Sequence, residues 1–174
     1  MISLRQERAA DVDAREALLN QAFGDARTRK ASQRLRDGRL PAEGLSLIAA
    51  DGRRVVGTVR LWNVACGGGQ KALLLGPMAV AANCRNRGIG AALVRRALRE
   101  ARRLGHGAVI LVGDAPYYSR FGFSADKAAD LKLPGPFERH RLLALELSPG
   151  ALDAADGLLR AVGRLAPPRQ ARAA

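Results

Sequence analysis

Several residue types are scarce in this chain of 174 residues, and each scarcity excludes a class of protein. The sequence has two cysteines, Cys66 and Cys84, and two histidines, with no Cys-x-x-Cys or Cys/His ligand spacing. A disulfide framework and a zinc site both require more of these residues at fixed spacings. We therefore expect no structural disulfide and no metal site.

Long apolar stretches are also missing. No run of about 18 apolar residues occurs, as a membrane-spanning helix would need, and the first residues lack the apolar core of a signal peptide. The sequence therefore predicts a cytoplasmic protein with no membrane partner. The chain length suits one domain with a single sizeable core.

Acidic residues are outnumbered, since 16 Asp and Glu accompany 29 Lys and Arg, a formal net charge of +13. This balance fits an anionic small ligand, a nucleic acid or a membrane surface. The basic residues are spread along the chain, aromatic residues make up only 4%, and no nucleic-acid module is recognisable. The distribution argues against nucleic acid as the main partner.

Residues 76–93 combine an apolar strand, a short polar loop and a helix start that contains glycine. Gly88 and Gly90 let a ligand approach the backbone closely, and the first N–H groups of a helix have no intrahelical acceptor. These donors and the helix dipole form an anion site, to which Arg85 and Arg87 add guanidinium groups. The spacing matches neither the dinucleotide-binding pattern nor the P-loop. We therefore predict a phosphate site of another type.

Hydrophobic patterning predicts a chain of alternating strands and helices. The apolar strands at 71–80 and 108–112 flank an amphipathic helix at 88–104, which is typical of a parallel β-α-β unit. Pro77 cannot donate to a strand ladder, so we expect a bulge at this point of the strand, with an edge strand as the alternative. Further strands are predicted at 2–5, 45–50, 55–64 and 142–147, and further helices at 11–23, 26–36 and 151–165.

Two short motifs follow each other in the middle of the chain. The pattern R-x-x-G-x-G spans residues 85–90 after a strand end at 78–80, and Y-x-x-F-G-F spans residues 118–123, one helix and one strand later. In this order they resemble the GNAT superfamily of acyl-CoA-dependent N-acetyltransferases, over roughly residues 1–147. The resemblance implies an α/β fold with a central mixed, twisted sheet, splayed at a strand bulge and covered by helices on both faces.

The resemblance also implies a coenzyme. Acetyl-CoA would lie with its pantetheine arm along the strand end and its pyrophosphate on the loop and helix start, and no metal is implied. The binding residues would be Met78, Ala79, Val80, Arg85, Asn86, Arg87, Gly88, Ile89, Gly90 and Ala91.

The implied reaction is direct attack of a primary amine, on a small molecule or a protein, on the acetyl thioester. Tyr118 would protonate the departing thiolate, because phenols and thiols have comparable pKa values, and Tyr117 would pack or form part of the substrate wall. Family members often carry a glutamate on the strand before the loop as general base, but residues 73–80 contain none. Deprotonation would then proceed through water, Asp114 or Glu43.

Two other functions stay open from the sequence alone. The missing glutamate favours a non-catalytic, CoA-binding regulatory module, and the basic surface favours a nucleic-acid-associated protein. The acceptor amine is also open, and we expect residues 26–44 and 131–140 to determine it.

The chain divides by pattern into three parts: an acetyltransferase domain at 1–147, a helical extension at 148–166 and a disordered basic tail at 167–174. The helix of the extension is amphipathic. It would either dock on its own domain or form a homodimer contact.

Overall fold

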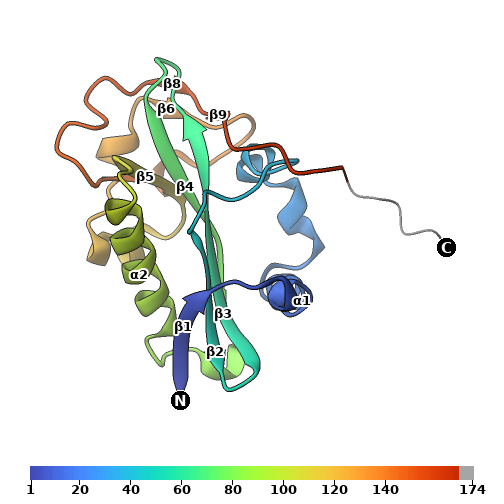
Figure 1. Cartoon of the computed structure of the whole chain (residues 1–174). Coiled ribbons are helices and arrows are strands. Elements are labelled where there is room, and N and C mark those ends of the chain that lie inside the picture. Colours follow the sequence, from blue (N-terminus) through green and yellow to red (C-terminus); the bar gives the residue numbers. More distant parts are fainter. Residues whose placement is uncertain (169–174) are drawn as a thin grey trace.

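The computed structural model describes residues 1–168, and its centre is a mixed sheet with helices on both faces (Figure 1). Neighbouring strands are antiparallel except for β4 and β5, which are parallel. β9 (Arg160–Ala161) adds to the free side of β3, and β6 (Leu131–Lys132) pairs with β8 (Gly157–Leu158) separately. The order across the main sheet is β1 (Ile2–Gln6), β2 (Ser46–Asp51), β3 (Arg54–Ala65), β4 (Lys71–Val80), β5 (Ala108–Val112) and β7 (Leu142–Glu146).

Two long helices lie on opposite sides of the sheet, α1 (Val12–Phe23) and α2 (Ile89–Arg103) (Figure 1). α3 (Ala115–Tyr118) is a single turn after β5. No helix within residues 1–168 is long and apolar enough to cross a bilayer. Short 3₁₀ turns make up the connections: η1 (Ala9–Asp11), η2 (Asp25–Arg29), η3 (Ala31–Leu35), η4 (Ala82–Cys84), η5 (Ser119–Phe121), η6 (Asp126–Ala128) and η7 (Arg139–Arg141).

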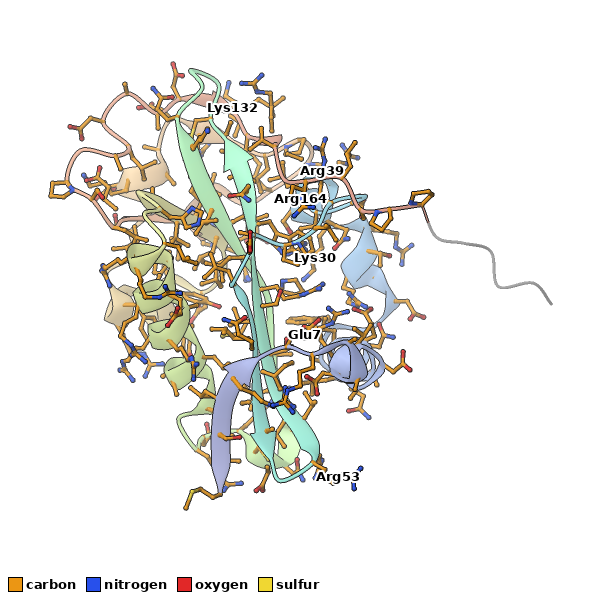
Figure 2. All side chains as sticks on the ribbon, in the orientation of Figure 1. Glu7, Lys30, Arg39, Arg53, Lys132 and Arg164 are labelled. Carbon is orange, nitrogen blue, oxygen red and sulfur yellow. The ribbon has the colours of Figure 1, made fainter. Side chains whose placement is uncertain are left out.

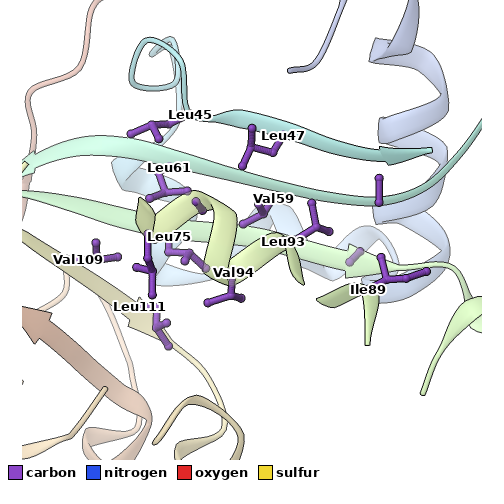
Figure 3. Packing of buried hydrophobic residues seen from close by; sticks show 14 of the residues in the cluster. Leu45, Leu47, Val59, Leu61, Leu75, Ile89, Leu93, Val94, Val109 and Leu111 are labelled. Atoms are coloured by element: carbon purple, nitrogen blue, oxygen red, sulfur yellow. The ribbon is translucent and has the colours of Figure 1, made fainter. Parts of the chain in front are cut away.

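Between Ala72 and Leu75, the side chains of β4 alternate between two hydrophobic clusters of the core. Leu73 and Leu75 belong to the cluster that includes Leu93 of α2, whereas Leu74 belongs to the cluster that includes Trp62. Figure 3 shows the α2 side chains against those of the strands. Because both faces are covered, the central strands must be apolar at successive positions, which explains the continuous apolar run of β5.

The predicted bulge is present in β4. Leu61 of β3 pairs with Leu75, and Val59 pairs with Met78, so β4 has one residue more than β3 between these two pairs. The extra length falls at Gly76–Pro77, where proline has no N–H to donate to the ladder. A bulge, rather than an edge strand, is therefore the reason for the proline.

β4 also separates from β5 at this point, as expected for a splayed sheet. The two parallel strands pair only at Leu73 and Leu74 of β4, and no pairing follows from Leu75 onward. The carbonyl of Gly76 instead accepts a hydrogen bond of 2.6 Å from Trp62 Nε1. The C-terminal half of β4, which leads into the loop before α2, is thus paired with a strand only on its β3 side.

The predicted helix over 26–36 is wrong. This segment forms η2 and η3, separated by Lys30 in an extended conformation (φ −69°, ψ 147°). Few of its residues are apolar, and Ala31 and Leu35 are the two that reach the core. A helix needs a wider apolar stripe to be held by packing, so short turns that bury these two side chains form instead.

The predicted helix over 151–165 is also wrong. A turn is followed by β8 and β9, and Gly157, with φ 73°, is the first residue of β8. Glycine lowers helix propensity, and the open ends of neighbouring strands offer this segment backbone partners. The extension thus joins the same body as residues 1–147. The part of the predicted tail at 169–174 lies outside the described residues.

We call residues 157–166 the C-terminal strap. It is held by backbone hydrogen bonds to several separate segments, and Figure 2 shows Arg39 and Arg164 close together where it meets the loop after η3. The strap thereby fastens that loop to the main sheet. The bonds run from Leu159 N to Lys132 O (2.9 Å), Val162 N to Asn63 O (3.2 Å), Leu40 N to Arg164 O (2.8 Å) and Ala166 N to Gly38 O (2.9 Å).

Candidate active site

Two cavities meet at Met78, on the separated half of β4. The first, of about 510 Å³, lies at the start of α2, and we call it the loop cavity. The second, of about 310 Å³, lies between β4, the η2–η3 segment and α3, and we call it the Tyr118 cavity. Both volumes are in the range of small-ligand sites.

The loop cavity is built around the sharp turn that starts α2. Asn86 and Gly88 have left-handed φ values of 62° and 75°, and the helix begins with the bond from Ala92 N–H to Gly88 O (3.0 Å). The N–H groups of residues 89–91 therefore have no helical acceptor and form a positive wall. The full lining is Met78, Val80, Cys84, Arg85, Asn86, Gly88, Ile89, Gly90, Ala91, Tyr117 and Arg120.

Eight of the ten residues predicted to bind the coenzyme line this cavity, and Ala79 and Arg87 do not. The Ala79 side chain is buried in the core. Arg87 is exposed, and its Nη1 lies 3.8 Å from Cys84 Sγ.

Sequence reasoning missed Cys84 and Arg120 as lining residues, and Tyr117, which was expected to pack or to form part of the substrate wall, lines the loop cavity. The Arg120 guanidinium lies over the Tyr117 ring, 4.3 Å from its centroid. A Cβ at Gly90 would come within 2.9 Å of Tyr117 Oη, so Gly90 makes room for this hydroxyl. The signal in the sequence was the tyrosine pair itself, since adjacent residues of a helical turn point in different directions and reach different cavities.

The Tyr118 cavity takes its walls from four separate parts of the chain. The η2–η3 segment provides one wall, the β4 bulge the floor, and the ends of β5 and η7 the rest. The lining is Phe23, Arg27, Lys30, Ser32, Gln33, Arg36, Pro77, Met78, Val112, Gly113, Asp114, Tyr118 and Arg141.

Tyr118 is fixed by close packing at the end of α3. A Cβ at Gly113 would lie 2.5 Å from its ring, so only glycine permits this position. The ring also stands edge-on to Tyr117, with centroids 5.0 Å apart. Burial, assisted by the proximity of Tyr117, raises the pKa of Tyr118 to about 12. The phenol therefore keeps its proton at neutral pH.

The structure separates the two carboxylates proposed as proton acceptors. Asp114 lines the Tyr118 cavity and is the one carboxylate among the described residues that does so. Glu43 is exposed in the loop before β2 and lies outside this lining. From β4 the cavity receives only Pro77 and Met78, so no carboxylate comes from that strand.

Comparison with known proteins gives the family of this chain. The family model described as "Acetyltransferase (GNAT) family" matches residues 12–123, which include β4, α2 and the Tyr118 segment. The chain belongs to the GNAT family of acetyltransferases. Membership makes it an acetyl-CoA-dependent N-acetyltransferase and confirms the predicted fold class. The alternative of a non-catalytic module is therefore set aside.

Similar GNAT proteins include the uncharacterized N-acetyltransferase YhbS of Escherichia coli K12, 30% identical over 159 residues, which are 90% of this chain and 93% of YhbS. The crystal structure of YhbS from Escherichia coli in complex with CoA has a TM-score of 0.78 and 30% identity, and covers 92% of this chain and 89% of that one. A GNAT acetyltransferase of Brucella melitensis, solved in complex with acetyl-CoA, has a TM-score of 0.63 and 28% identity over 86% of this chain and 90% of its own. The expectations on location, nucleic acid and a homodimer stay predictions.

Ionisation of the two tyrosines of the chain tests the environment of Tyr118. We expect the native protein to show fewer phenolates at about pH 10.5 than the denatured protein, in which both phenols ionise near pH 10. The measurement is a near-ultraviolet phenolate titration. The part of the phenolate titration that is shifted to higher pH, which we assign to Tyr118, should be lost in Tyr118→Phe and retained in Tyr117→Phe. A wild type that titrates like the denatured chain would contradict the buried phenol.

Proposed function

We propose that the enzyme binds acetyl-CoA in the loop cavity and transfers the acetyl group to a primary amine held in the Tyr118 cavity. The observation that carries this proposal is the meeting of the two cavities at Met78, where β4 has left β5. A thioester at this point has a phosphate-binding wall on one side and a proton donor on the other.

The coenzyme fits the loop cavity by its chemistry. Its pyrophosphate would accept hydrogen bonds from the free N–H groups at the start of α2, with Arg85 and Arg120 as charged donors. The pantetheine amides would pair with the β4 backbone over residues 78–80, because the side of β4 that faces away from β3 has no strand partner there. Ala79 would contribute through its backbone alone, and Arg87 would act from the exposed loop.

The reaction needs no protein nucleophile. The neutral amine attacks the thioester carbon, so that the N–C bond forms and the C–S bond breaks, with the oxyanion intermediate stabilised by a backbone N–H near Val80. Tyr118 donates its proton to the leaving thiolate and is reprotonated from solvent. Asp114, directly or through water, accepts the proton that the ammonium form of the acceptor loses before the attack, and the proton that the new amide nitrogen loses goes to solvent.

Gly90→Glu is expected to abolish binding of acetyl-CoA. Gly90 has ordinary helical backbone geometry, so the variant adds bulk and negative charge to the loop cavity without backbone strain. At about 100 times its dissociation constant, acetyl-CoA should stabilise the wild type by about 2.7 kcal/mol, a rise in Tm of roughly 5–10 °C. Thermal unfolding with and without acetyl-CoA measures this rise in Tm. Ala17→Glu, an equal charge change at an exposed position of α1, should keep the rise, and an undiminished rise in Gly90→Glu would refute this site.

Tyr118→Phe is expected to lower kcat by about 10²- to 10⁴-fold, the usual contribution of a general acid, with little change in the affinity for acetyl-CoA. Because its pKa is raised to about 12, wild-type kcat should show no loss from ionisation of Tyr118 below about pH 11. Steady-state thiol release, measured over a range of pH, gives both the kcat of Tyr118→Phe and the pH dependence of the wild-type kcat. Tyr117→Phe, which alters the loop cavity, should act mainly on the KM for acetyl-CoA. A Tyr118→Phe enzyme with normal kcat would remove Tyr118 from the mechanism.

Asp114→Asn is expected to lower kcat/KM by about 10- to 100-fold near pH 7. The deficit should shrink as the pH approaches the pKa of the acceptor amine, because an amine that is already neutral has no ammonium proton to lose before it attacks. The pH–rate profile of kcat/KM for the amine measures this dependence. Glu43→Gln should match the wild type, and a deficit in Asp114→Asn that stays constant with pH would rule out proton transfer as its cause.

A further inference from the structure

The walls of the Tyr118 cavity carry an excess of positive charge. Four cations line it, Arg27, Lys30, Arg36 and Arg141, against one carboxylate, Asp114. Arg27 is neutralised from outside the cavity, because its Nη2 lies 2.5 Å from Glu16 Oε2. The other three cations have no carboxylate within salt-bridge distance in residues 1–168.

Arg36 is the most informative of the three, because it is half-buried and its side-chain hydrogen-bond partners are neutral, with the charge of Asp37 acting on it only through space. Its guanidinium donates to Gln33 Oε1 (3.3 Å) and Ser32 Oγ (3.4 Å), both long hydrogen bonds. Burial lowers the pKa of Arg36 to about 10, so it is still charged at neutral pH. Keeping a partly desolvated cation without a carboxylate in direct contact costs free energy, and a bound anion would offset that cost.

The position of Arg36 relates it to the reaction. A Cβ at Gly76 would lie 3.4 Å from Arg36 Nη1, so the guanidinium is against the β4 bulge, next to the point where the two cavities meet. Arginine presents a planar fork of N–H donors that matches carboxylate and phosphate oxygens. An acceptor anchored here would have its reactive end within the same small cavity as Tyr118.

Lys30 and Arg141 extend this positive surface outward. Lys30 lies on the stretch between η2 and η3 (Figure 2), with its Nζ 5.2 Å from the centroid of the Phe23 ring. Both residues also line an adjoining cavity of about 560 Å³ toward the exterior, together with Glu138, whose Oε2 lies 3.3 Å from His140 Nε2. Cationic side chains therefore lie all the way from the adjoining outer cavity to the β4 bulge at the inner end of the Tyr118 cavity.

We propose that the acceptor is a small primary amine that also bears a carboxylate or phosphate group, and that Arg36, with Lys30 and Arg141, binds this anion. The inference rests on the proposed function, since it specifies the molecule that occupies the Tyr118 cavity. A volume of about 310 Å³ favours a small molecule over a folded protein surface. Asp114, as the lone carboxylate of the lining, faces the amino end of such a molecule, and the cations face its acid end.

The test compares amines that differ only in the anionic group. Thiol release from acetyl-CoA is measured with O-phosphoethanolamine against ethanolamine, and with β-alanine against propylamine, at low salt to limit screening. At least one anionic amine should exceed its neutral partner by about 10-fold or more in kcat/KM, as hydrogen bonds between charged groups allow. The pair with the larger ratio identifies phosphate or carboxylate as the anion.

Variants connect this preference to the site. Arg36→Gln should lower the ratio of kcat/KM between anionic and neutral amine by about 10-fold or more, and Arg36→Lys, which restores the charge without the fork, should recover part of it. Arg53→Gln is the matched control, because Arg53 is exposed at the β2–β3 turn, at one end of the molecule and away from Lys30 (Figure 2). It should leave the ratio unchanged. A rise in Tm with acetyl-CoA in each variant verifies that the coenzyme site is intact.

Four outcomes would overturn the inference. The first is equal or faster acetylation of the neutral amines, and the second is an equal loss for both amines of a pair in Arg36→Gln. The third is faster acetylation of an acidic peptide than of any small amine. The fourth is an enzyme that acetylates no anionic amine with acetyl-CoA and that, with CoA bound, is not thermally stabilised by any of them. By contrast, a wild type that acetyl-CoA does not stabilise would defeat the proposed function itself.

Discussion

The separation of β4 from β5 after Leu74 is the feature on which the rest of the site depends. A strand in the middle of a sheet normally satisfies its backbone groups on both sides, and leaving one side open costs free energy for each group that finds no partner. Here the cost is offset by packing on both faces of the sheet. Leu73 and Leu74, the last positions of β4 that pair with β5, are both fully buried there. The bulge at Gly76–Pro77 fixes where the separation begins. Both cavities exist because two strands that start as neighbours do not end as neighbours.

The two cavities use positive charge in different ways. In the loop cavity the donors are mostly backbone N–H groups, whose positions follow from the turn at Asn86 and Gly88 and from the axis of α2. Such donors are fixed by the fold and cannot be altered without altering the helix start. In the Tyr118 cavity the positive groups are side chains on short turns, which can change by single substitutions while the sheet stays as it is. A common coenzyme site and a variable acceptor site follow directly from this division.

The coenzyme half of the molecule could be predicted from the sequence because its signals are local. The apolar strands, the amphipathic α2 and the glycines at its start are contiguous in the chain, and Pro77 alone indicated the bulge. The acceptor half depends on contacts between distant residues. Nothing in the sequence distinguishes Arg27, which has Glu16 as a partner, from Arg36, which has neutral partners. The environment of Tyr118 is equally non-local, because the cavity that it lines takes its other walls from the η2–η3 segment, β4 and Arg141. The two mistaken helices, at 26–36 and 151–165, failed for the same reason, since tertiary partners outweighed local pattern there.

The C-terminal strap gives the enzyme an order of assembly. During synthesis β4, α2 and β5 leave the ribosome while the strap is still to be translated, so the unit that holds the coenzyme can form from contiguous chain. The loop after Arg36 receives its hydrogen bonds from residues 164–166 only when almost the whole chain is present. A polypeptide interrupted before Arg164 would therefore keep the part that forms the loop cavity but leave the loop that follows η3, beside the Tyr118 cavity, unfastened.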